Sequence, residues 1–222
     1  ILYPVDARLR PEGGSSILAL SFESYESYLQ KRAAVWERLA LSRTRVLAGD
    51  GEFGGKVLDR IEHFVMGNGL SGSEVREIVD IRRRMETQQR SGGQLSIKTG
   101  PGGIVDIEFL VQILQIRHGG ESPQLRSPNT LVSLGRLEEA GILIDEEAEH
   151  LRDAFIFLRS IEKMLRRQDE RATTRLPSND RDLVALSRAV GFARPDDFMQ
   201  TLRQKMGKTR EAFQTHLGEA TR

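Results

Sequence analysis

The spacing of apolar residues after Ser21 constrains the fold of this chain more than any other feature. From there on, apolar side chains recur at intervals of three and four residues, which places them along one face of an α-helix. Glycine-containing breaks interrupt the pattern, so several helices are predicted, with Ser73, Asn129 and Ser178 as N-caps. The segments expected to be helical are about 25–47, 53–66, 73–90, 104–118, 129–140, 145–170, 179–190 and 195–217.

The residues before Ser21 follow a different pattern. Residues 1–10 alternate between apolar and charged side chains, which is typical of a β-strand, and the apolar run Ile17–Leu20 suits a second strand. The sequence therefore predicts a mainly α fold, a multi-helix bundle with a short β segment at its N-terminus. A further extended stretch is expected near Gln94–Lys98.

The apolar stripes also predict the core. The side chains expected to be buried are Trp36, Leu39, Ile107, Val111, Leu114, Leu151, Phe155 and Leu158. Arg43 falls on the same stripe as Trp36, so it is expected to face inward and to need a carboxylate or phosphate partner. An internal salt bridge and a bound anion would both meet that need.

Composition excludes several classes of protein. The 222 residues carry 33 basic and 32 acidic side chains, and this near-neutral balance argues against binding nucleic acid through bulk charge. No apolar run reaches the ~18 uninterrupted residues that a membrane span needs. Because the chain has no cysteine, disulfides and thiol nucleophiles are excluded, and a cytoplasmic location is expected.

Asp6, Arg8 and Arg10 share one face of the predicted first strand. A carboxylate beside two guanidinium groups can form a structural ion network, or it can bind a metal next to arginines that neutralise phosphate. Metal-assisted nucleotidyl transfer needs several carboxylates around Mg²⁺, so Asp6 alone cannot provide such a site.

A glycine-rich loop, Gly100–Gly103, follows Lys98 and leads into the helix expected at Ile104. Free N–H groups at a helix N-terminus can bind an anion, although this loop lacks the Gly-Lys-Ser/Thr ending of a P-loop. Tight packing that requires glycine is the alternative. Asp106 and Glu108 lie about 200° apart around the helix, so they cannot both contact one ion.

The remaining polar residues show no catalytic pattern. His63, His118, His150 and His216 lack the spacing of a metal site, and no Ser-His-Asp set can be proposed. The run Arg82–Arg84 is expected on a solvated helix face.

Four groups of residues nevertheless resemble a known family. They are Tyr3-x-Val5-Asp6-x-Arg8-Leu9-Arg10-Pro11-x-Gly13, Trp36-Glu37-Arg38-x-Ala40-Leu41-x-Arg43-x-Arg45, Gly102-Gly103-Ile104-x-Asp106-Ile107-Glu108-Phe109-x-x-Gln112 and Phe157-Leu158-Arg159-x-x-Glu162. In this order and spacing they resemble the bacterial glutamine synthetase adenylyltransferases, which are bifunctional enzymes with two similar nucleotidyltransferase halves. The resemblance covers nearly the whole chain.

The resemblance implies a reaction. One half of such an enzyme transfers AMP from ATP to a tyrosine hydroxyl of glutamine synthetase. The other half removes it by phosphorolysis, and PII-type signalling proteins bias the balance. Each half binds Mg²⁺ through an Asp-x-Asp pair and a third acid on a later strand, which Asp6 matches. The Asp-x-Asp pair is absent from this sequence, so we expect the isolated chain to be inactive.

The resemblance also predicts a division of the chain. Residues 1–48 would be the C-terminal part of a nucleotidyltransferase domain, and residues 49–222 the helical domain that follows it. Residues 1–3 before the first motif favour the adenylylating half, whereas Phe157-Leu158-Arg159 also resembles the deadenylylating half.

The implied site consists of Asp6 as the catalytic metal ligand together with a larger set of candidates for binding nucleotide or phosphate. That set is Arg8, Arg10, Arg43, Arg45, Lys98, Gly102, Gly103, Asp106 and Glu108. The alternative function is a helical docking module that binds glutamine synthetase or a signalling protein and catalyses nothing itself.

Overall fold

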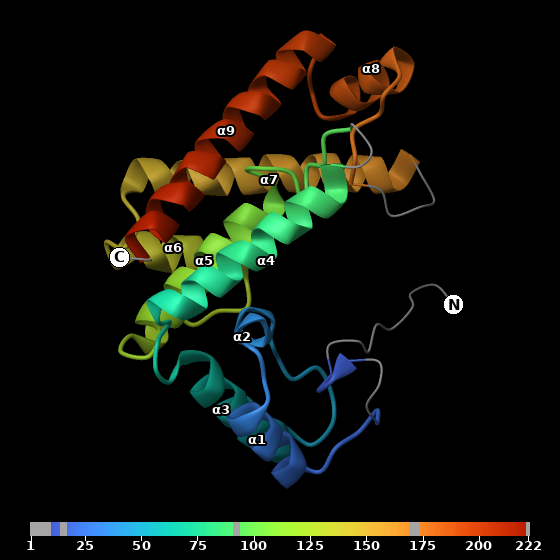
Figure 1. Ribbon diagram of the computed structural model, residues 1–222. Helices are drawn as coiled ribbons and strands as arrows, with labels where there is room; N and C mark the ends of the chain where they lie inside the picture. Colours follow the sequence, from blue (N-terminus) through green and yellow to red (C-terminus); the bar gives the residue numbers. More distant parts are fainter. Residues whose placement is uncertain (1–9, 14–16, 91–93, 169–173, 221–222) are drawn as a thin grey trace.

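The computed structural model describes residues 10–13, 17–90, 94–168 and 174–220. Within these ranges the chain is helical, as predicted, and contains no strand (Figure 1). The helices are α1 (Phe22–Lys31), α2 (Val35–Leu41), α3 (Gly51–Met66), α4 (Gly72–Arg90), α5 (Ile104–His118), the 3-10 helix η2 (Pro123–Leu125), α6 (Thr130–Glu139), α7 (Asp145–Gln168), α8 (Asp180–Ala189) and α9 (Pro195–Ala220). None of these helices is both long and apolar enough to cross a bilayer.

The β segment expected at the N-terminus is not seen. The first predicted strand falls almost entirely on residues 1–9, which lie outside the described ranges. Ile17–Leu20 is described and forms no strand, and the side chain of Ile17 is 66% exposed. The extended stretch expected at 94–98 is present as a single antiparallel bridge between Ser96 and Arg175.

Helix α5 is the centre of the bundle. Eleven of its 15 residues are buried, and they lie on every side of the helix. A helix that is apolar all round is stable in water only when other helices surround it. Here α2, α3, α6, α7 and α9 all pack against α5.

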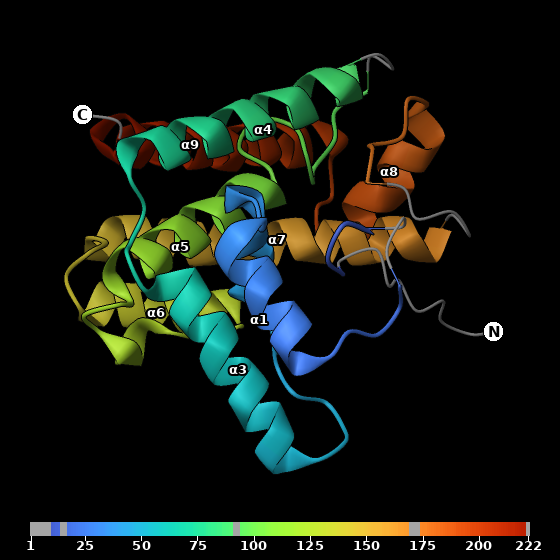
Figure 2. The same cartoon turned by 60° about the horizontal axis from the view of Figure 1, so that its bottom comes forward.

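The other helices form layers around α5. The long helices α4 and α9 lie side by side on one face, and α6 and α7 lie on the opposite face (Figures 1 and 2). Helices α1, α2 and α3 form a smaller group at one end, where α3 packs against α1, α2 and α5. The bundle therefore brings α2 and α7 to α5 from different directions.

The single helix predicted over 25–47 is wrong. The chain leaves the helix at Arg32 and starts a new one at Val35, because the Glu37 carboxylate accepts a hydrogen bond from the N–H of Ala34 at 2.8 Å. Because α2 begins anew at Val35, its buried face is rotated relative to the apolar face predicted for one continuous helix. Trp36, expected in the core, is 43% exposed, and Arg43 lies beyond the end of α2.

The other core predictions are confirmed. Every remaining member of the expected core is buried: Leu39, Ile107, Val111, Leu114, Leu151, Phe155 and Leu158. Asn129 caps α6 as expected, whereas Ser71 and Asn179 replace Ser73 and Ser178 as caps of α4 and α8. Ser71 and Glu74 bond reciprocally through side chain and backbone and so form a capping box.

The contrast between two neighbours on α2 gives a test of this packing. Leu39→Ala should lower the free energy of unfolding by about 2–5 kcal/mol, because the Leu39 side chain is only 3% exposed. Trp36→Ala should cost clearly less, because much of the Trp36 side chain already contacts water. Urea unfolding followed by circular dichroism measures both, and a larger loss for Trp36→Ala would contradict the described orientation of α2.

Candidate functional site

Arg38 in the second motif is a structural residue. Its guanidinium is buried and donates to the backbone oxygens of Val65, at 2.7 and 3.1 Å, and of Gly69, at 2.6 Å. It also donates to Glu74 at 2.9 Å. These bonds satisfy the buried charge and tie α2 to the turn between α3 and α4.

Glu74 is held in its charged form. Burial alone would raise the pKa of its carboxyl, but hydrogen bonds from the N–H and hydroxyl of Ser71, together with the Arg38 charge, outweigh burial and lower the pKa. The ion pair with Arg38 is therefore complete at neutral pH.

The end of the first motif is tied to α1 and α2 through Tyr28. The Tyr28 hydroxyl donates to the Glu37 carboxylate at 2.8 Å and accepts from the N–H of Glu12 at 3.5 Å. Burial and the hydrogen bond to Glu37 raise the pKa of Tyr28. Arg10 lies close to this junction in the chain and is partly buried, whereas Asp6 and Arg8 lie outside the described residues.

The glycine loop serves packing, not anion binding. The first N–H groups of α5 are already bonded: Ile104 donates to the oxygen of Ile97 and Val105 to that of Lys98, both at 3.0 Å. Gly102 has φ +72°, and a Cβ there would lie 1.7 Å from the carbonyl oxygen of Met206 on α9. The expectation that Gly102 and Gly103 bind phosphate is therefore replaced by the packing alternative, since the donors are taken.

Asp106 is also a core residue and cannot contact a nucleotide. Its side chain is fully buried and accepts from Nε of Arg82 at 2.5 Å, the N–H of Gly102 at 2.6 Å and Nη1 of Arg210 at 3.1 Å. Arg82, expected on a solvated face, is 1% exposed because Asp106 neutralises it. We therefore withdraw Asp106 from the candidate binding residues.

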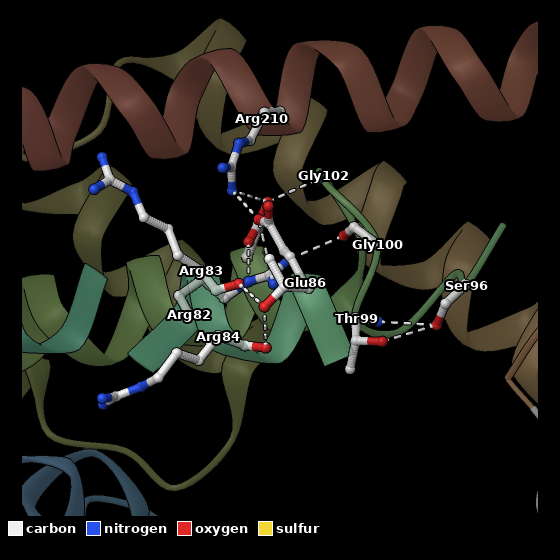
Figure 3. Close-up of polar contacts among 11 residues, drawn as sticks. Arg82, Arg83, Arg84, Glu86, Ser96, Thr99, Gly100, Gly102 and Arg210 are labelled. Carbon is white, nitrogen blue, oxygen red and sulfur yellow. Dashed lines mark hydrogen bonds and ion pairs between the residues drawn. The ribbon is translucent and has the colours of Figure 1, made fainter. Parts of the chain in front are cut away.

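Glu86 completes this cluster, which we call the buried ion cluster (Arg82, Glu86, Asp106 and Arg210). Its Oε1 lies 2.8 Å from Nη1 of Arg210 and 3.3 Å from Nη1 of Arg82. Arg82 and Glu86 come from α4 and Arg210 comes from α9 (Figure 3). Asp106 belongs to the first turn of α5. Two acids and two bases balance, so the cluster joins three helices without leaving net charge inside.

A second ionic group lies nearer the surface, centred on Glu108. Its Oε1 accepts from Nη1 of Arg43 at 2.9 Å and from Nη2 of Arg159 at 2.6 Å. Arg159 also donates to the buried Glu162 at 2.6 Å, and Glu162 accepts from Arg166 at 2.8 Å. We call these five residues the Glu108 cluster.

The Glu108 cluster unites three of the four sequence motifs. Arg43 follows α2, Glu108 belongs to α5, and Arg159 and Glu162 belong to α7. The side chains of Arg43 and Arg159 are 41% and 36% exposed, so both reach solvent. Of the two interpretations left open for Arg43, the structure bears out the salt bridge, with a carboxylate 65 residues away.

Two other candidates take no part in the Glu108 cluster. Arg45 is exposed and Lys98 is half-buried, and neither makes a described contact with the cluster. Arg159 was missed as a candidate, although Arg159, Glu162 and Arg166 form a charged stripe at helical spacing that could have indicated it. Among the described residues, no group of three His, Cys, Asp or Glu side chains could hold a metal ion.

Comparison with known proteins agrees with the motifs. The family model described as glutamate-ammonia ligase adenylyltransferase matches residues 1–60, and that described as GlnD PII-uridylyltransferase matches residues 77–217. A bifunctional glutamine synthetase adenylyltransferase/adenylyl-removing enzyme from Hahella chejuensis (strain KCTC 2396) is 36% identical over 192 residues, or 86% of this chain. The chain spans 20% of the length of that relative.

Removing the charge of Asp106 tests the buried ion cluster. Asp106→Asn should lower the free energy of unfolding by about 3–5 kcal/mol, because the isosteric amide leaves Arg82 buried with an unbalanced charge. Asp80→Asn is the matched control, since Asp80 pairs with Arg83 on the exposed face of α4. Equal, small losses in urea unfolding would show that the cluster contributes little.

The glycine loop gives a second test. Gly102→Ala should destabilise by at least about 1–3 kcal/mol, because alanine is strained at positive φ and its Cβ overlaps the backbone of α9. Gly135→Ala, within α6 where a Cβ meets nothing within 4 Å, should instead stabilise slightly. Thermal melting compares the two, and a Gly102→Ala protein that melts like the wild type would refute the close contact with Met206.

Proposed function

Since the chain belongs to the glutamine synthetase adenylyltransferase family, we propose that it is part of a nucleotidyltransferase that transfers AMP from ATP to a tyrosine of glutamine synthetase. In the longer protein this transfer, with its reversal by phosphorolysis, would regulate nitrogen assimilation. Glutamine synthetase and a PII-type signalling protein are the proposed partners, and the cytoplasm is the proposed location.

One observation carries the proposal. Three motif segments that are far apart in the sequence meet at a single carboxylate, Glu108, and present Arg43 and Arg159 to solvent. Exposed guanidinium groups held in place by an acid are suited to binding phosphate oxygens.

Asp6 is the proposed metal ligand. Two-metal transfer needs a group of carboxylates, and the described residues contain no such group. We therefore propose that Asp6 completes a Mg²⁺ site with an Asp-x-Asp pair in another part of the longer protein, and that the isolated chain does not transfer AMP. Arg8, Arg10, Arg45 and Lys98 stay proposed contacts of the nucleotide.

The proposed architecture follows the same division as the motifs. Residues 1–48 would complete the nucleotidyltransferase domain, and residues 49–222 would form the helical domain beside it. The adenylylating half is the proposed origin. The uridylyltransferase match over 77–217 supports a helical domain of a kind shared by nucleotidyltransferases that act in different reactions.

Substitution of Asp6 in the full-length protein tests this function. Asp6→Asn keeps the shape of the side chain and removes a metal-ligand charge, so transfer of radiolabelled AMP to glutamine synthetase should fall by at least about a hundredfold. The melting temperature should stay near that of the wild type. Asp50→Asn is the matched control, because Asp50 caps α3 and asparagine caps equally well.

Two results would contradict the proposal. Equal transfer rates for Asp6→Asn and wild type would remove Asp6 from the metal site. Parallel losses of activity and melting temperature would instead indicate a structural ion pair.

A further inference from the structure

We propose that Arg159 and Arg43, both held by Glu108, form a clamp for the polyphosphate chain of a nucleoside triphosphate. The choice of a nucleotide rests on the proposed function. The inference adds Arg159 of α7 to the residues that bind the nucleotide, and it makes Glu108 a positioning residue, because a carboxylate repels phosphate but can hold the arginines that bind it.

The geometry of Glu108 brings the two guanidinium groups together. A single oxygen, Oε1, accepts from Arg43 at 2.9 Å and from Arg159 at 2.6 Å. Glu108 itself is largely covered, with 13% of its side chain exposed, so the acid lies beneath and the bases lie outside. An anion approaching from solvent therefore meets the arginines before it meets the carboxylate.

Both arginines keep donors for a ligand. A guanidinium has five N–H groups. In the described contacts, Arg43 uses one of them on Glu108, and Arg159 uses one on Glu108 and one on Glu162. The remaining N–H groups can donate to phosphate oxygens without breaking these bonds.

Arg159 is held more firmly than an ordinary surface arginine. Its guanidinium lies over the ring of Phe155, 5.0 Å from the ring centre, and it is fixed by two carboxylates. Such fixed donors lose little conformational entropy when a ligand binds. Arg166, bound to Glu162, adds a third positive charge, so the Glu108 cluster carries more positive than negative charge.

These properties favour a ligand with several anionic oxygens. Two neighbouring guanidinium planes can each make paired hydrogen bonds, and a polyphosphate offers successive phosphoryl groups to receive them. A carboxylate offers only two oxygens, whereas a polyphosphate offers enough anionic oxygens to accept from the remaining N–H groups of both guanidiniums. The polyphosphate is therefore the ligand class that fits the clamp best.

Calorimetric titration of the 222-residue chain with inorganic tripolyphosphate at low ionic strength tests the clamp. We expect saturable binding that weakens at least about tenfold in Arg159→Gln and in Arg43→Gln. Arg83→Gln is the matched control, because Arg83 is an exposed arginine of α4 that pairs with Asp80 of the same helix and takes no part in the Glu108 cluster. Absence of binding by the wild type, or equal weakening by Arg83→Gln, would overturn the proposal.

The Glu108→Gln variant distinguishes a role of Glu108 in positioning the two arginines from the effect of its negative charge on anion binding. The substitution makes the cluster more positive, so charge alone predicts tighter binding of tripolyphosphate. A positioning role predicts weaker binding, because the amide holds the two arginines less firmly, and tighter binding would remove that role from Glu108. Thermal melting of each variant identifies any that fail to fold.

The proposed function can fail separately from the clamp. If Arg159→Gln in the full-length protein transfers AMP as fast as the wild type, the clamp is overturned while the transferase function stands. If wild-type full-length protein transfers no AMP but the isolated chain binds tripolyphosphate as described, the clamp stands and the function fails.

Discussion

Arg82 on α4 is buried with its charge, and Asp106 in the first turn of α5 neutralises it at 2.5 Å. A charge taken out of water is costly unless it is paired and hydrogen-bonded, so α4 and the start of α5 must stay together. Arg210 extends the same constraint to α9. The same ion pair also fixes the Gly100–Gly103 loop. The oxygen of Gly100 accepts from Arg82 at 3.0 Å, and the N–H of Gly102 donates to Asp106.

This constraint also determines which face of α5 carries Glu108. With Asp106 turned into the buried ion cluster, Glu108 lies about 200° further around the helix and faces the opposite way. There it meets Arg43 and Arg159. One short motif therefore supplies a structural acid and, two residues later, an acid that organises the exposed arginines.

Much of the fold could be predicted from the sequence, because helical periodicity depends on local spacing. The core positions of α5 and α7 followed from it, whereas Trp36 did not, since a break at Arg32–Ala34 shifted the stripe. The buried position of Arg82 could not be predicted from a run of three arginines, because only its tertiary partner makes burial possible.

The candidate site was predicted less completely than the fold. Family resemblance singled out Arg43 and Glu108, but Glu108 and Arg159 are 51 residues apart in the sequence, and no local pattern indicates that they touch. At the Gly102 loop, by contrast, the local sequence pattern is clear but fits two different interpretations. Glycine before a helix suits both an anion site and close packing, and only tertiary structure distinguishes them, through the bonded N–H groups of Ile104 and Val105 and the position of Met206.

The central claim is that the pairing of Arg82 with Asp106 fixes the arrangement of the helices, and a double-mutant cycle measures it most directly. Urea unfolding of Arg82→Met, Asp106→Leu and the double variant gives the coupling free energy. We expect each single substitution to cost about 3–5 kcal/mol and the double variant to cost far less than their sum, since it leaves neither charge unpaired. Single effects that add to within ~0.5 kcal/mol would contradict the account, because independent residues show such additivity.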